Sequence, residues 1–156
     1  MKTTIARCIF STFALIAIIT ASATFAANPR LKEVRKIHVG YLSSIGHKRG
    51  HLVPVAPGSA GEVKKRITAA LVSSGRFSVV SKESEADATL EGDAGYIHSE
   101  KDGKKFTTGF ADLKLEDRKT HEVLWTFEYK PQPGAGGSAA QRVADQAVQR
   151  LLEEAK

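Results

Sequence analysis

The sequence predicts an α+β fold of two layers, in which two helices cover one face of a mixed, mostly antiparallel sheet of five strands. Two observations predict it. A strand, a helix and a second strand follow one another in the first half of the chain. Three strands with period-two alternation and a final amphipathic helix then complete an order of β-α-β-β-β-β-α.

The first strand is predicted over residues 34–42, which are rich in Val, Ile and Tyr. A helix is predicted to begin at Ser59, because Ser59 and Glu62 have the spacing of a capping box. Its apolar stripe is formed by Val63, Ile67, Ala70 and Leu71. Gly75 should end this helix in a left-handed conformation. Residues 76–80 are then predicted to form a second strand parallel to the first.

Three strands over residues 86–99, 106–117 and 122–129 are predicted to form an antiparallel meander with one buried face. Asp102 and Gly103 have the chemistry of a tight hairpin turn between the first two. The side chains expected on the buried face are Ala111, Leu113, Leu115, Val123, Trp125, Phe127 and Tyr129. Leu124 departs from this alternation.

Glycines and a capping serine mark two further features. Gly92 and Gly95 interrupt the strand over residues 86–99, where we expect a bulge or a close approach of another chain segment. Ser138 should cap the final helix. The apolar side of that helix is formed by Ala140, Val143, Ala144, Ala147, Val148 and Leu151.

Residues 43–58 are predicted to be a long loop without regular structure, because glycines and prolines punctuate them. Loops of this length are uncommon unless they have a function. The loop residues predicted to contact a partner are His47, Lys48, Arg49 and His51. An envelope protein or an anionic envelope polymer is the expected partner.

Residues 1–26 are predicted to be a secretory signal peptide. Basic Lys2 and Arg7 precede an apolar stretch, and small residues follow it up to the expected cleavage between Ala26 and Ala27. Cleavage after Ala23 is the second choice. Residues 27–156 would then form a single α+β domain in the periplasm or outside the cell. The alternative is an uncleaved signal that anchors the chain in the membrane.

Cleavage would also change the chemistry of the chain. It removes Cys8, the one cysteine, and it lowers the net charge from +6 to +4 by removing Lys2 and Arg7 from the 23 basic residues, against 17 acidic ones. Cys8 precedes the apolar stretch, whereas bacterial lipid attachment requires a cysteine at the cleavage site. We therefore expect no disulfide and no lipid anchor, and the dispersed charge argues against nucleic acid as a partner.

Residues 70–80 and 85–92, which include the run SGRFSVV, resemble a family of small bacterial envelope domains. The resemblance is to the α/β domain shared by the curli-secretion lipoprotein family and the N-terminal domain of the Tol-system β-propeller protein. It continues in residues 113–117 and 122–125. It implies a non-catalytic envelope domain that binds proteins or assembles. This chain lacks both a lipidated cysteine and an evident pore-forming insertion, so no channel is predicted.

The sequence predicts no catalytic residue, no metal site and no cofactor. His47 and His51 are four residues apart, but no carboxylate or cysteine lies near them on the loop to complete a metal site. The spacings of phosphate-binding loops and of a nucleophile elbow are absent from the sequence. Two alternatives to a binding domain stay open: a small ligand-binding or hydrolytic periplasmic enzyme, and a structural envelope protein that self-associates through an uncovered sheet face. The oligomeric state is not predicted.

Overall fold

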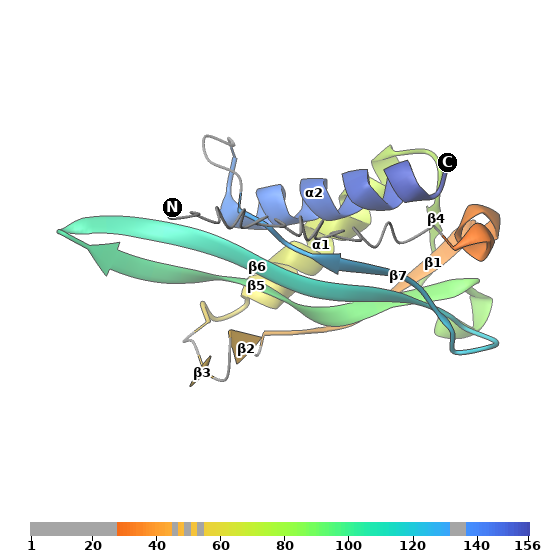
Figure 1. The fold of residues 1–156 in the computed structure, drawn as a ribbon, viewed down its shortest axis with the longest axis horizontal. Helices are drawn as coiled ribbons and strands as arrows, with labels where there is room; N and C mark the ends of the chain where they lie inside the picture. Colours follow the sequence, from red (N-terminus) through yellow and green to blue (C-terminus); the bar gives the residue numbers. More distant parts are fainter. Residues whose placement is uncertain (1–27, 45–46, 49–50, 53–54, 132–136) are drawn as a thin grey trace, which may run out of the picture.

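The computed structural model of the chain confirms the predicted fold class. It describes residues 28–44, 47–48, 51–52, 55–131 and 137–156. The main sheet has the strand order β4-β1-β5-β6-β7. Two helices, α1 and α2, lie side by side on one face of this sheet (Figure 1). The element order is the predicted one, with additional short elements described below.

The predicted β-α-β unit is present. It consists of β1 (Lys36–Ser43), α1 (Ser59–Ser73) and β4 (Ser78–Val79), and β1 pairs in parallel with both β4 and β5. Gly75 follows the helix with a φ of 66°, a left-handed conformation that costs glycine little. The prediction for the end of α1 is therefore confirmed.

The predicted capping box is wrong. Gly58 occupies the N-cap of α1, and Ser59 is the first helical residue, with a fully buried hydroxyl that makes no hydrogen bond among the described residues. The Glu62 carboxylate accepts a hydrogen bond of 2.8 Å from the Tyr96 hydroxyl. Glu62 thus ties the start of α1 to the sheet, and the backbone N–H of Glu62 is satisfied by the Gly58 carbonyl.

The antiparallel meander is confirmed, although the bounds of its strands differ from the predicted ones. It consists of β5 (Ala88–Lys101), β6 (Lys104–Asp117) and β7 (Val123–Glu128). β5 is shifted by two residues, β6 begins two residues earlier, and β7 is one residue shorter at each end. Asp102 and Gly103 join β5 to β6 with φ angles of 52° and 72°, as a tight hairpin turn requires. β1 and β7 are much shorter than β5 and β6, so the far part of the β5–β6 hairpin extends beyond the rest of the sheet (Figure 1).

One face assignment in β7 is wrong. The pairing shifts by one residue, from Leu115 opposite Trp125 to Glu116 opposite Val123, and this leaves Leu124 as an extra residue. Such a bulge re-aims the neighbouring side chains. Val123, predicted on the buried face, is therefore exposed, whereas Leu124 is buried. Trp125, Phe127 and Tyr129 are buried as predicted.

The final helix, α2 (Ala139–Glu154), follows the prediction. The Ser138 side chain accepts a hydrogen bond from the Gln141 amide, and all six residues of the predicted apolar stripe are buried. α2 approaches β6 closely at Gly109, where a Cβ atom would lie 2.6 Å from Val143 Cγ2. Close approaches also explain the predicted special glycines of β5. A Cβ at Gly92 would meet the Asp112 carbonyl at 2.2 Å.

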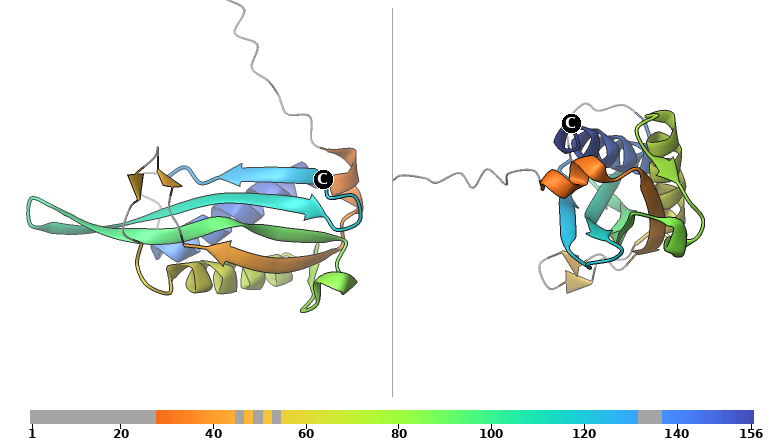
Figure 2. Two further views of the ribbon diagram at one scale, coloured as in Figure 1. Left: turned by 90° about the horizontal axis from the view of Figure 1, so that it is seen from below. Right: turned by 90° about the vertical axis from the view of Figure 1, so that its right-hand side faces the viewer.

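The prediction that residues 43–58 lack regular structure is wrong in part. The two-residue strands β2 (His47–Lys48) and β3 (His51–Leu52) pair antiparallel, which lets a long loop satisfy some of its own backbone hydrogen bonds. This pair lies on the side of the sheet opposite the helices (Figures 1 and 2).

Two short 3-10 helices complete the fold. The first, η1 (Pro29–Glu33), precedes β1, and the second, η2 (Glu83–Glu85), precedes β5. η1 lies at the end of the molecule opposite the tip of the β5–β6 hairpin (Figure 1). Within the described part of the chain, no helix has the length and apolar content needed to cross a membrane.

Candidate interaction surfaces

The loop residues predicted to contact a partner lie largely outside the described part of the chain. The backbones of His47, Lys48 and His51 lie in β2 and β3. Arg49, and the side chains of all four residues, lie outside the described part of the chain. The loop site therefore stays a prediction.

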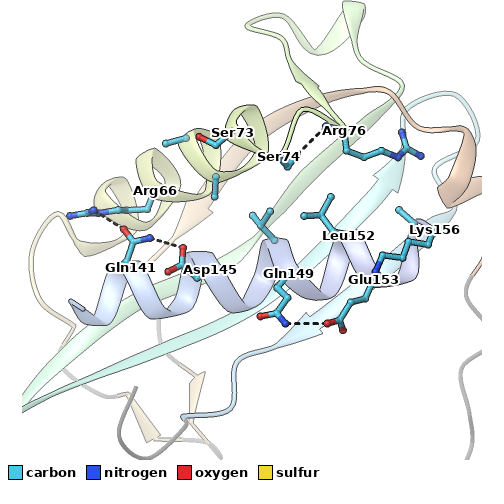
Figure 3. Close-up of a pocket in the computed structure, with 14 residues that line it drawn as sticks. Arg66, Ser73, Ser74, Arg76, Gln141, Asp145, Gln149, Leu152, Glu153 and Lys156 are labelled. Atoms are coloured by element: carbon cyan, nitrogen blue, oxygen red, sulfur yellow. Dashed lines mark hydrogen bonds between the residues drawn. The ribbon is translucent and has the colours of Figure 1, made fainter. Parts of the chain in front are cut away.

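A groove of about 920 Å³ lies between α1 and α2 (Figure 3). Its apolar part is formed by Ala69, Ala70, Val148, Leu152 and Ala155. Small side chains on α1 leave this space open, because they do not fill the volume that faces Leu152. Its volume is in the range of about 300–1,000 Å³ that is usual for small-ligand sites.

The polar rim of this groove is already engaged in contacts within the chain. Arg66 donates a hydrogen bond of 2.7 Å to the Gln141 side chain, which in turn donates to Asp145 (Figure 3). Arg76 donates to the backbone carbonyls of Val34 and Lys32 at 3.0 and 2.8 Å. Partial burial lowers the pKa of Arg76, with a smaller contribution from nearby Arg35. The groove therefore has an apolar floor, and the side chains of Arg66, Asp145 and Arg76 on its rim are engaged in contacts within the chain.

The sheet face opposite the helices carries a row of carboxylates. Asp93 of β5 lies directly opposite Asp112 of β6, and Asp112 lies directly opposite Glu128 of β7. Among the described residues, no basic side chain forms an ion pair with any of these three. We call Asp93, Asp112 and Glu128 the acidic row.

Lys114 of β6 lies beside the acidic row, two residues from Asp112 on the same strand. Lys114 Nζ lies 2.9 Å from both Glu91 Oε1 and Glu116 Oε2. These two hydrogen bonds, that to Glu91 first, raise the pKa of Lys114. The same contact with Lys114, and a weaker one with His121, lower the pKa of Glu116. The positive charge of Lys114 is therefore committed to two other carboxylates.

The same sheet face exposes large apolar side chains. Tyr41 is 80 % exposed and Val123 45 % exposed, and both line a shallow depression of about 520 Å³ with Asp93 and Asp112. Tyr41 stands where the pairing of β1 with β5 shifts register, between Val39 and Leu42. Apolar side chains grouped on an exposed face are typical of an interaction surface.

A charged cluster fixes the start of the domain at the opposite end from the hairpin tip. Arg30 of η1 forms ion pairs of 2.8 Å with both Asp117 and Glu122, and Asn28 also donates to Glu122. The pKa of Asp117 lies below its ordinary value, chiefly because the Thr120 amide donates a hydrogen bond to its carboxylate. This cluster joins η1 to the β6–β7 turn and has a structural role.

The histidine side chains that the structure describes contact a backbone carbonyl, a threonine hydroxyl and a carboxylate. His38 Nδ1 lies 3.2 Å from the Val80 carbonyl, and His98 Nδ1 lies 2.9 Å from Thr107 Oγ1. His121 Nδ1 lies 3.0 Å from Glu116 Oε1. In the part of the chain that the structure describes, no three His, Cys, Asp or Glu side chains are grouped so that they could hold a metal ion.

Sequence reasoning missed both the helix groove and the acidic row. The polar half of the alternation in β5 and β6 was visible, and it includes the carboxylates of Glu91, Asp93, Asp112 and Glu116. The signal that would have found the row is the register, which puts Asp93, Asp112 and Glu128 side by side. The turn residues Asp102 and Gly103 fix that register for β5 and β6.

No protein-family model matches the sequence, and no curated protein matches it. Several solved structures have a similar fold. A point variant of the PelC dodecamer from Paraburkholderia phytofirmans has a TM-score of 0.54 at 15 % identity, with 78 % of this chain and 89 % of that chain covered. A second structure of the PelC dodecamer has a TM-score of 0.51 at 14 % identity, with 77 % and 86 % covered.

Lipoprotein GNA1162 from Neisseria meningitidis is also similar, with a TM-score of 0.50 at 14 % identity. The match covers 76 % of this chain and 99 % of the lipoprotein. At such identities the likeness shows a shared fold alone. It supports a fold like that of bacterial envelope lipoproteins, while the finer resemblances to the curli-secretion family and to the Tol-system domain stay predictions.

Proposed function

We propose that the protein is a secreted or periplasmic, non-catalytic domain of the bacterial cell envelope that works by binding and assembling with other chains. The observation that carries the proposal is the asymmetry of its sheet. One face is buried beneath two helices, and the other exposes Tyr41 and Val123 beside the acidic row. Covering the apolar side chains of such a face with another chain is energetically favourable.

The structural comparisons support assembly as the mode of action. PelC, which shares this fold, is a dodecamer. GNA1162, which also shares it, is a lipoprotein. The predicted signal peptide supports the envelope as the location. A self-associating envelope protein was one of the alternatives drawn from the sequence, and it agrees best with the exposed sheet face.

The proposal is tested on protein that has been exported by its own signal and purified from the periplasm. Mass spectrometry should give an N-terminus at Ala27, and light scattering over a range of concentrations should give an oligomer. Val123→Ser should weaken the assembly, because it removes an apolar contact from the sheet face. Val72→Ser is the matched control, since Val72 is 57 % exposed but lies on α1.

Three results would contradict the proposal. An N-terminus still at Met1 would contradict cleavage of the signal. A protein that is monomeric at every concentration would contradict assembly. A loss of assembly in Val72→Ser, with Val123→Ser unchanged, would place the interface on the helices instead of the sheet.

A further inference from the structure

We infer that the far end of the β5–β6 hairpin of one copy docks across the acidic row of a second copy. This inference rests on the proposed function of self-assembly and specifies its interface. The docking element is residues 97–108, which we call the arm. β1 pairs with β5 only as far as Asp93, and β7 pairs with β6 only from Asp112 onward. The arm is therefore a two-stranded ribbon without neighbouring strands.

A two-stranded ribbon is marginally stable in water unless something covers one of its faces. Figure 2 shows the arm reaching beyond both helices and the other strands. Its base is held, because Tyr96 is bonded to Glu62 and Gly109 packs against Val143. Towards the tip, its described side chains are exposed from His98 to Thr107. An uninterrupted pairing of 14 residues in each strand would thus be better stabilised with a partner on the arm.

The two faces of the arm differ in chemistry. Because side chains alternate along a strand and the β5–β6 pairing has no register shift, Lys104 and Phe106 lie on the same sheet face as Asp112. Phe106 is 47 % exposed. Lys105 lies on the other face, as does the His98–Thr107 hydrogen bond. The open sheet face therefore has a basic and apolar end at the arm and an acidic end at the body.

Within the part of the chain that the structure describes, the acidic row lacks a counter-charge. The arm of a second copy could supply one. Carboxylates directly opposite one another across a sheet are destabilising. Lys114, two residues from Asp112 on the same face of β6, is already shared between Glu91 and Glu116. A lysine brought in by a second chain would relieve the repulsion within the acidic row. Phe106 would at the same time cover Tyr41 and Val123, the exposed apolar side chains beside that row.

Charge also favours one relative orientation of two copies over another. Stacking the acidic rows of two copies on each other would bring like charges together at a cost. An arrangement in which the arm of one copy lies over the body of the next brings Lys104 to the carboxylates. Three of the four large apolar side chains that are exposed among the described residues, Tyr41, Phe106 and Val123, are then buried in one contact.

The inference is tested by reversing charge on each side of the contact and then mixing the two variants. Lys104→Glu should weaken self-association by about tenfold or more, because the arm then meets carboxylates. The double variant Asp93→Lys with Asp112→Lys should weaken it similarly. An equimolar mixture of the two should recover association, since each contact in a mixed assembly joins a basic to an acidic group.

Lys105→Glu is the matched control, because it makes the same charge change one residue away on the opposite face of the arm. It should leave association within about twofold of the original protein. Circular dichroism melts are used to check that each variant is folded. Association is measured by analytical ultracentrifugation at low salt and again at about 1 M NaCl, where the variants should differ less.

The outcomes separate the inference from the proposed function. If the original protein assembles but the mixture does not recover association, the arm does not dock on the acidic row, and the proposed function stands. Equal losses in Lys104→Glu and Lys105→Glu would also overturn the inference. If the original protein is monomeric at every concentration, both the inference and the proposed function fail.

Discussion

The two faces of the β5–β6 pair show how one stretch of chain serves two purposes. On the helix side, Leu90, Leu113 and Leu115 are buried beneath α1 and α2. On the opposite side of the same two strands lie Asp93 and Asp112, which line an open depression. Burial on one side supplies the free energy of folding, so the other side can carry mutually repelling charges without loss of the fold.

The largest effect that follows from this comparison is expected on the helix side. Leu115 is fully buried, so Leu115→Ala should lower the free energy of unfolding by about 2–5 kcal/mol through lost burial and a cavity. Thr126→Ala is the control on the exposed side of β7 and should change it by less than about 0.5 kcal/mol. Urea denaturation measures both, and similar losses would contradict the asymmetry.

The next effect tests how closely α2 packs on the sheet. A Cβ atom at Gly109 would lie 2.6 Å from Val143 Cγ2 and 3.2 Å from the Ala139 carbonyl. Gly109→Ala should therefore destabilise the protein by about 1–3 kcal/mol, as overpacking does. Val143→Ala removes the obstructing methyl group and leaves a cavity of its own.

The control for this effect is the double variant. If the clash is the cause, Gly109→Ala combined with Val143→Ala should cost less than the sum of the two single changes. Thermal and urea denaturation of the original protein, the two single variants and the double variant give the coupling energy between the two changes. Additive losses would mean that the approach of α2 to β6 is looser than the structure shows.

Much of this asymmetry could be predicted from the sequence. The alternation of Ala111, Leu113 and Leu115 predicted the buried face of β6, and the stripe of α2 was predicted residue by residue. Both patterns reflect burial. In a strand every second residue faces the core, and in a helix every third or fourth residue does. The Asp102-Gly103 turn was also predicted, because its positive φ angles demand those residues.

Features that depend on contacts between distant segments could not be predicted. Ser59 and Glu62 have the spacing of a capping box. The Glu62 carboxylate instead accepts a hydrogen bond from the hydroxyl of Tyr96, which is 34 residues away in the sequence. The bulge that exposes Val123 and buries Leu124 depends on the pairing of β7 with β6. The acidic row likewise exists only once three strands are in register. These features arise from tertiary structure, which overrides local preference.

The smallest effect, of opposite sign, is expected on the open face. Asp112 stands between Asp93 and Glu128, so Asp112→Asn removes two like-charge pairs. In dilute protein, where chains do not associate, the change should raise the free energy of unfolding by about 0.2–1 kcal/mol.

Salt provides the internal control for this last effect. The gain should shrink as NaCl is raised to about 1 M, where charges separated by more than about 3 Å are screened. Glu83→Gln likewise removes one carboxylate charge, from an exposed residue of η2 away from the acidic row, and should shift stability by less than about 0.5 kcal/mol. A loss of stability in Asp112→Asn would mean that the carboxylate is satisfied within the single chain. A gain that vanishes in salt would mean that the open face keeps its charges at the expense of stability, as a surface retained for a basic partner does.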